Sequence, residues 1–259
     1  MRRRPSVRVA SRNEPVLGHI RAIKAEHPFW GYRRVWAHLR YVDGLTVNKK
    51  RVLRLMQTHS LTVKGNVRLK ARRTPSRSKP RPSRPNEWWG IDMTKVMTRR
   101  SGWVHLVVVV DWRTKKFVGH FAGRRCLSRH WLEALEGAVT RQFPLTGSME
   151  QGLSVMSDNG SQPTSVAFMR SCHHLGIRQA FTSYGNPKGN ADTERAIRTM
   201  KEELLWLREW EDEHEVAQEV GRWVERFNEH YLHSTLGYRT PNQVEHQLQT
   251  GPGNLLDAA

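Results

Sequence analysis

Ser154 to Gln162 reads S-V-M-S-D-N-G-S-Q, and Gly185 to Lys201 reads G-N-P-K-G-N-A-D-T-E-R-A-I-R-T-M-K. In the first stretch a short apolar run ends at Asp158, and the Asn-Gly pair that follows predicts a turn. The second stretch predicts a glycine-containing loop and then a helix with Glu194 near its start. Thirty-five residues separate the two acids. The two stretches therefore place one carboxylate at the exposed end of a buried strand and another on a helix.

A third carboxylate, Asp92, lies within W-W-G-I-D-M-T, a run typical of a strand that starts at Trp88. Carboxylate oxygens of this kind suit Mg²⁺ or Mn²⁺. Two such ions about 3.5–4 Å apart can clamp the attacking and leaving oxygens of a phosphodiester. We therefore expect Asp92, Asp158 and Glu194 to form a two-ion metal site. Asp92 would bridge both ions, and each of the other acids would hold one.

Asp111 is the main rival to Asp92, because it also ends a predicted strand. If a hairpin turn is centred near Arg99 and Arg100, Asp92 lies opposite about Val107. Asp111 is then four residues further along, roughly 13 Å away at about 3.3 Å per residue. We interpret Asp111 as a residue that forms the next turn.

The predicted helix around Glu194 carries two cations on the face of that acid, Arg198 at i+4 and Lys201 at i+7. Beside a metal site these cations could bind the phosphates that flank a scissile bond, although a basic helix face is usually only solvated. Asp192 is two residues from Glu194, and their side chains diverge by about 200° on a helix. An acid in the first turn is favoured by the helix dipole, which is enough to explain Asp192.

The loop before this helix, 184–190, is expected to be mobile and to become ordered when DNA and metal bind. Gly185, Pro187 and Gly189 suit such a segment. Lys188 and Asn190 in the same loop are candidate DNA contacts.

The composition indicates a polyanionic partner. The chain has 43 Lys and Arg against 24 Asp and Glu, a formal net charge of +19 and a pI of about 10.8. Nucleic acid is favoured over a membrane, because no apolar run approaches the roughly 18 residues of a spanning helix. The two cysteines are far apart and in no ligand spacing, which fits a reducing cytoplasm. Cys172-His173-His174 is an improbable metal cluster, because adjacent helical side chains point apart.

The first part of the chain predicts a small all-α DNA-binding domain, 1–63. Residues 1–15 are expected to form a loose basic arm, and three short helices follow, the third capped by Thr46 and running to about His59. Three helices with a glycine-containing turn before a basic third one resemble a helix-turn-helix. The alternative is a helical bundle whose basic face is merely solvated. The candidate DNA contacts are Arg33, Arg34, Lys50, Arg51 and Arg54.

A basic, proline-rich linker is predicted at 64–86, where nine Lys or Arg and no acid occur in 64–85. An α/β core, 87–232, and a C-terminal tail, 233–259, follow. The predicted strands are 88–97, 102–111, 117–122, a run ending at Asp158 and 178–181, and the predicted helices are 128–142, 165–175 and the segment that carries Glu194. By analogy of element order, this is a ribonuclease-H-like core with a mixed five-stranded sheet and flanking helices.

Five ordered motifs resemble a known family. W-G-I-D-M-T, S-D-N-G-S-Q and K-G-N-A-D-T-E-R look like the D,D(35)E core of retroviral integrases and insertion-sequence transposases. H-P-F-W-G-Y-R-R-V-W-A-H-L-R from His27 and F-N-E-H-Y-L-H-S-T-L-G-Y-R-T-P from Phe227 are also similar. The nearest resemblance is to the downstream-frame (OrfB) transposase of two-frame bacterial insertion sequences, and it covers about residues 17–245.

The resemblance implies a DDE transposase in which Asp92, Asp158 and Glu194 bind Mg²⁺ or Mn²⁺. Water would free a 3′-hydroxyl at the element end, and that hydroxyl would attack target DNA. The implied partners are double-stranded DNA, further copies of the chain in a multimer and an upstream-frame (OrfA) protein, joined by frameshifting. The implied location is the bacterial cytoplasm, on the nucleoid when DNA is bound. The alternatives are a non-catalytic, sequence-specific DNA-binding protein derived from a transposase and a general ribonuclease-H-like nuclease.

Overall fold

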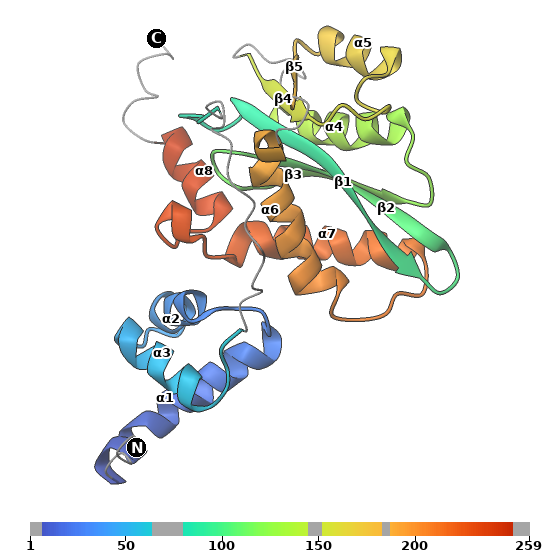
Figure 1. Ribbon diagram of the computed structural model, residues 1–259. Helices are drawn as coiled ribbons and strands as arrows, with labels where there is room; N and C mark the ends of the chain where they lie inside the picture. The colour runs from blue at the N-terminus through green and yellow to red at the C-terminus, as the bar shows by residue number, and fades with distance from the viewer. Residues whose placement is uncertain (1–6, 64–79, 145–151, 183–186, 251–259) are drawn as a thin grey trace. The chain divides into compact units, whose positions relative to one another are not determined.

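A computed structural model describes residues 7–63, 80–144, 152–182 and 187–250 (Figure 1). The chain divides into two compact units, 1–73 and 74–259, which are described separately below. In the parts described, no helix is both long enough and apolar enough to cross a membrane.

The N-terminal unit consists of helices α1 (Val7–Glu26), α2 (Tyr32–Tyr41) and α3 (Lys49–Thr58). The unit is held together by an apolar core to which all three helices contribute. Its buried members include Leu17, Ile20, Val35, Leu39, Val52 and Met56.

Two expectations for this unit were wrong. Residues 7–15 belong to α1 rather than to a loose arm, and the guanidinium of Arg51 on α3 donates to the Asn13 side chain (2.9 Å) and to the Arg12 carbonyl (2.5 Å). A contact between two helices cannot be predicted from the local sequence pattern of either one. The N-cap of α3 is Asn48 rather than Thr46, because the Asn48 side chain accepts from the Lys50 amide at 2.8 Å.

The second unit is built on a five-stranded mixed sheet in the order β3-β2-β1-β4-β5. Strands β1, β2 and β3 form an antiparallel meander, and β4 and β5 continue the sheet in parallel with β1. The strands are β1 (Trp88–Thr98), β2 (Gly102–Asp111), β3 (Phe117–Gly123), β4 (Ser154–Ser157) and β5 (Arg178–Phe181). The expected α/β class and mixed five-stranded sheet are confirmed.

Helices cover both faces of this sheet (Figure 1). One face packs against α4 (Ser128–Gln142) and α5 (Val166–His174), with Ile91, Val107, Val109, Trp131, Leu135 and Phe168 in the core. Helix α6 (Ala191–Met200) packs against β1, and α7 (Glu213–His230) packs against β3. The apolar stripe predicted on α7 is buried as expected: Val216, Val220, Trp223, Val224 and Phe227.

Two shorter segments flank α6. A 3-10 helix, Pro187–Asn190, leads into it, and a π-helix, Lys201–Leu205, follows it directly. The segment expected to be a C-terminal tail is partly folded. It contains a bridge between His233 and Arg239, a 3-10 turn (Ser234–Leu236) and helix α8 (Pro241–Thr250), which packs against α7.

Candidate active site

The pairing of β1 with β4 brings Asp92 and Asp158 side by side. The two strands are parallel, and their last paired residues are Gly90 and Met156. Each acid lies two residues beyond its strand's member of that pair. Asp92 lies within β1, which continues to Thr98, whereas Asp158 directly follows β4. Neighbouring strands are about 4.8 Å apart, so the register places the two residues at the same level of the sheet.

Helix α6 carries Glu194, and the start of this helix docks directly on β1. Asn190 is buried, and its side-chain amide donates to the Ile91 carbonyl at 3.3 Å. The close approach depends on Gly90, since a Cβ there would lie 1.8 Å from the Thr193 hydroxyl and 2.5 Å from the Trp112 indole nitrogen.

The electrostatics of Asp92 show that the three acids interact. Burial of its carboxyl group, and next the negative charges of Asp158 and Glu194, raise the pKa of Asp92 to about 6. The amide of Met93, which donates to Asp92 at 2.7 Å, and the positive charge of Lys201 act in the opposite direction. A partly buried carboxylate thus meets two further acids and one cation, so a positive charge placed between the acids would relieve their repulsion.

Asp158 and Glu194 are exposed, whereas Asp92 is half-buried. Asp158 is held by a tight turn in which its carboxylate accepts from the Gly160 amide at 3.1 Å. The next residue, Asn159, fastens the turn to β5 by donating to the Thr182 carbonyl at 2.7 Å. The candidate site therefore has one half-buried acid, Asp92, and two acids that are exposed to solvent, Asp158 and Glu194.

The donor set suits a hard divalent cation. Across residues 7–63, 80–144, 152–182 and 187–250, no three His, Cys, Asp or Glu side chains are close enough together to hold one ion jointly. Mg²⁺ usually takes only one or two carboxylates and completes its shell with water and substrate oxygens. Asp92, Asp158 and Glu194 supply oxygen ligands of this kind, and Asp158 and Glu194 act electrostatically on Asp92.

Asp111 has a structural role in the turn after β2, as predicted from its position at the end of that strand. Its buried carboxylate accepts from the Asn86 amide (2.7 Å) and from the amide and hydroxyl of Thr114 (2.7 and 2.9 Å), which closes the turn after β2. The expected partner of Asp92 was wrong by one position, because Asp92 lies opposite Val108 and not Val107.

The candidate DNA contacts near the acids differ in their availability. Arg198 is exposed but forms an ion pair with Glu202 at 2.8 Å. Lys201 is half-buried and acts electrostatically on Asp92. Asn190 is 4% exposed and its side-chain amide donates to the Ile91 carbonyl of β1, so its contact with DNA stays a prediction. The Lys188 side chain lies outside the described part of the chain, as does 184–186 of the loop expected to be mobile.

The candidate contacts of the N-terminal unit also fall into two groups. Arg33, Lys50 and Arg54 are exposed, whereas Arg34 is half-buried. The guanidinium of Arg51 is engaged by α1, as described above. Three of the five cations therefore lie at exposed positions, and the Arg33 guanidinium also donates to the Tyr32 hydroxyl at 3.2 Å.

Sequence reasoning missed the residues that position α6. The indole of Trp112 and the hydroxyl of Thr193 are hydrogen-bonded beside Gly90, and none of the three was singled out. A glycine in the interior of a strand is itself a signal of close backbone approach. Asp192, in contrast, forms an ion pair with Lys115 at 3.4 Å, in addition to its place in the first turn.

Comparisons with known proteins agree with this architecture. The family "Integrase core domain" matches residues 82–187, a second family of the same description matches 175–241, and "HTH-like domain" matches 11–70. The simian T-cell lymphotropic virus intasome in complex with PP2A regulatory subunit B56 gamma has a similar fold. Its TM-score is 0.53 with 19% sequence identity, and the match covers 90% of this chain and 76% of that one.

Curated relatives are transposases. The transposase for insertion sequence element IS904 of Lactococcus lactis subsp. lactis is 31% identical over 257 residues, covering 95% of this chain and 98% of the relative. The transposase for IS629 of Shigella sonnei is 28% identical over 261 residues, covering 95% and 83%.

Fold and matched domains define a polynucleotidyl transferase with an integrase core and a helix-turn-helix-like unit. The chain belongs to the family of insertion-sequence transposases.

Proposed function

We propose that this transposase cleaves DNA at the ends of an insertion sequence and transfers the freed strand to target DNA, with Asp92, Asp158 and Glu194 as its catalytic acids. The observation that supports the proposal is the electrostatic interaction of the three carboxylates: the negative charges of Asp158 and Glu194 add to burial in raising the pKa of Asp92 to about 6. Acids that repel one another at an open edge suit a site that receives cations and phosphates.

Mg²⁺ or Mn²⁺ would be held by these three acids, and two ions would stabilise the charges on the attacking and leaving oxygens. In the first step, water attacks the phosphorus at the element end, and the bond to the 3′-oxygen breaks to give a 3′-hydroxyl and a 5′-phosphate. In the second step, that hydroxyl attacks a target phosphodiester, forming a new P–O bond and releasing the target 3′-oxygen. The nucleophiles of the two steps are water and a DNA hydroxyl, so no protein–DNA covalent bond forms.

The chain's own residues recognise and orient the DNA. Lys201, whose charge reaches Asp92, would bind a phosphate next to the scissile one, and Arg198 could do so after leaving Glu202. The N-terminal unit would bind the terminal repeats through Arg33, Lys50 and Arg54, which are exposed. Joining two element ends requires at least two copies of the site, which supports a multimer on DNA. An upstream-frame partner would extend DNA recognition, and the work would take place in the bacterial cytoplasm.

Cleavage of a duplex bearing the element's terminal repeat tests this proposal. With Mg²⁺ or Mn²⁺ present, purified protein should nick the repeat end. Asp158→Asn should abolish nicking while leaving the thermal midpoint and DNA affinity close to those of the wild type. Asp192→Asn is a matched control on the Glu194 helix and should retain activity. Full activity in Asp158→Asn would refute the site assignment. Tight DNA binding by the wild type without metal-dependent nicking would instead favour a non-catalytic DNA-binding protein.

A further inference from the structure

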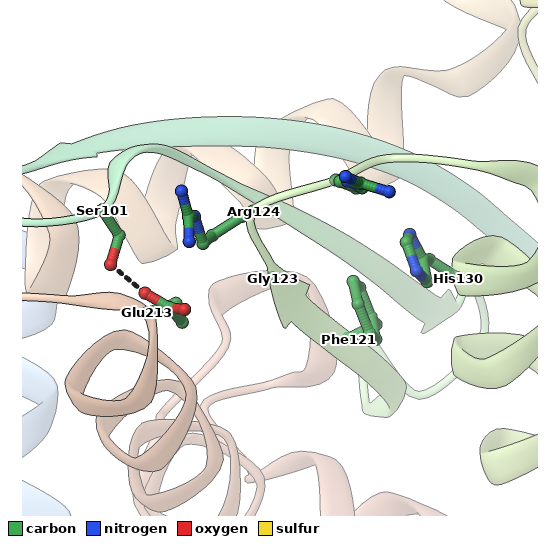
Figure 2. Close-up of a pocket in the computed structure, with 7 residues that line it drawn as sticks. Ser101, Phe121, Gly123, Arg124, His130 and Glu213 are labelled. Carbon is green, nitrogen blue, oxygen red and sulfur yellow. Dashed lines mark hydrogen bonds between the residues drawn. The ribbon is translucent and has the colours of Figure 1, made fainter.

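A hollow of about 510 Å³ lies at the carboxyl end of β3, away from the three acids. It is bordered by the last residue of β3 (Gly123), by Ser101 of the β1–β2 hairpin and by the first residue of α7 (Glu213). Figure 2 shows Arg124 on the side of the Ser101–Glu213 hydrogen bond, with the stacked rings of Phe121 and His130 across the hollow.

The lining of the hollow carries an uncompensated positive charge. Arg124 and Arg125 are exposed, and neither forms a hydrogen bond or ion pair with any residue of the described ranges. The one carboxylate of the lining, Glu213, accepts from the Ser101 hydroxyl. By contrast, Arg99 on the neighbouring hairpin is paired with two acids of the segment before α7. Two guanidinium groups are thus left with their donors available to an external anion.

The segment that bears these arginines is fastened to the Asp158 turn. The side-chain amide of Gln162, four residues after Asp158, donates to the Cys126 carbonyl at 3.2 Å. The indole of Trp131 on α4 donates to the Cys126 sulfur at 3.2 Å, which holds the same segment from the other side. Strands β1, β3 and β4 run in the same direction, and Arg124 directly follows the carboxyl end of β3 as Asp158 follows that of β4.

The strand register gives the distance between Asp92 and the end of β3, where the arginines begin. Asp92 is aligned with Val108 and, through it, with His120, and Gly123 is three residues further along β3. Two strand spacings and three residues along a strand correspond to about 14 Å. This separation equals roughly four base pairs at 3.4 Å per nucleotide of one strand.

We propose that Arg124 and Arg125 form a second DNA-contacting site, which binds backbone phosphates of the duplex that lies across the catalytic acids. The inference rests on the proposed function, since it assigns these arginines to the same DNA. Exposed guanidinium groups around an open hollow suit a polyanion that passes over the surface. The contacts are to phosphates, so they fix the position of the duplex without reading its sequence.

The test is DNA affinity measured as a function of salt, in EDTA so that no cleavage occurs. A fluorescent duplex of generic sequence is titrated with the full chain at several NaCl concentrations. Arg124→Ala/Arg125→Ala should lower the slope of log K against log salt by about 1.8, because each lost phosphate contact contributes about 0.9. The control Arg222→Ala/Arg226→Ala removes the same charge from exposed positions of α7 and should leave the slope near that of the wild type. Arg124→Lys/Arg125→Lys should restore most of the slope, since lysine also binds phosphate as a point charge.

An alanine double variant whose slope equals that of the wild type, with an unchanged thermal midpoint, would overturn the inference and leave the cleavage proposal intact. A reduction of equal size in the α7 control would also overturn it, because the effect would then be one of net charge. A reduced slope confined to the Arg124/Arg125 variant would support the site even if no nicking were ever detected. Should the alanine variant unfold, Arg124→Gln/Arg125→Gln gives the same comparison with the side-chain volume largely kept.

Discussion

The indole nitrogen of Trp112 donates a hydrogen bond of 3.0 Å to the hydroxyl of Thr193, across 81 residues of sequence, and both side chains are buried. Trp112 directly follows β2, and Thr193 directly precedes Glu194. The bond therefore ties the start of α6 to the sheet that carries Asp92. It fixes both the position of the helix and its rotation about its own axis, which decides where the Glu194 carboxylate points.

Thr193→Val tests the role of this hydrogen bond, because valine keeps the shape of threonine and removes the hydroxyl that accepts from Trp112. The buried indole N–H is left without a partner, which costs about 1–3 kcal/mol of unfolding free energy. We expect a lower free energy of unfolding in urea and a lower nicking rate at unchanged DNA affinity. Thr199→Val is the matched control on α6, since the Thr199 hydroxyl only donates to the Arg195 carbonyl of its own helix. Equal losses in the two variants would show that the Trp112 bond does not position Glu194.

Gly90→Ala should be among the most damaging single-methyl changes in the sheet. A Cβ there would lie 1.8 Å from the Thr193 hydroxyl and 2.7 Å from the Asn190 side-chain oxygen. Overpacking of a rigid core costs about 1–3 kcal/mol, and we expect a loss at the upper end of that range in thermal and urea unfolding. Gly137→Ala is the control, because its new Cβ meets only the flexible end of Arg141 at 3.6 Å within α4. It should raise stability by about 0.5–1 kcal/mol, and a tolerated Gly90→Ala would contradict the docking of α6 described here.

Asp92→Asn should stabilise the metal-free protein at pH 7.5. The folded-state pKa of Asp92 is raised from 3.8 to about 6, so its protonated form favours folding, and that contribution is lost as the pH rises through about 6. At about 1.36 kcal/mol per pKa unit, the ionised carboxylate costs at most about 3 kcal/mol at pH 7.5, and asparagine removes that cost. We expect a gain in EDTA at pH 7.5 that vanishes at pH 4. Mn²⁺ should raise the midpoint of the wild type but not that of Asp92→Asn, and a variant that is less stable than the wild type in EDTA would contradict the repulsion between the acids.

His120 should make the protein sensitive to mild acid. Burial, and next the charge of Arg141, lower the pKa of His120 to about 4 in the folded state. The unfolded chain takes up a proton near pH 6.5 while the folded chain does not, so stability present above pH 6.5 is lost as the pH falls toward 4. The full loss is about 3 kcal/mol at 1.36 kcal/mol per pKa unit. His120→Gln should flatten the urea-unfolding profile between these limits, and His246→Gln, at an exposed position, should leave it as steep as in the wild type.

The local sequence pattern was enough to predict where an element begins or ends wherever turn-forming or capping residues flank it. Both ends of β2 and of α4 were predicted correctly, and Asp158 does follow β4 directly. The register of the hairpin was missed by one residue because the turn has three residues, Arg99 to Ser101, between the paired Thr98 and Gly102. Gly102 takes a left-handed φ of +67° to close that turn, and the sequence does not reveal where such a turn is centred.

Features that depend on contacts between distant segments were not predictable. The loop before α6 was predicted to be mobile because of its glycines and proline, yet the side chain of its last residue, Asn190, is buried and donates to the Ile91 carbonyl. Helix α1 extends further than its apolar pattern because Arg51 of α3 bonds to it. The hollow lined by Arg124 and Arg125 is formed by three segments that are far apart in the chain.

The parallel pairing of β1 with β4 has a consequence for when the protein can act. The chain between those strands includes β2, β3 and α4, so the pair closes a long loop, and such contacts form slowly and late. Glu194 comes later still in the order of synthesis. A nascent chain on the ribosome therefore completes its helical N-terminal unit before the elements that carry Asp92, Asp158 and Glu194 can come together.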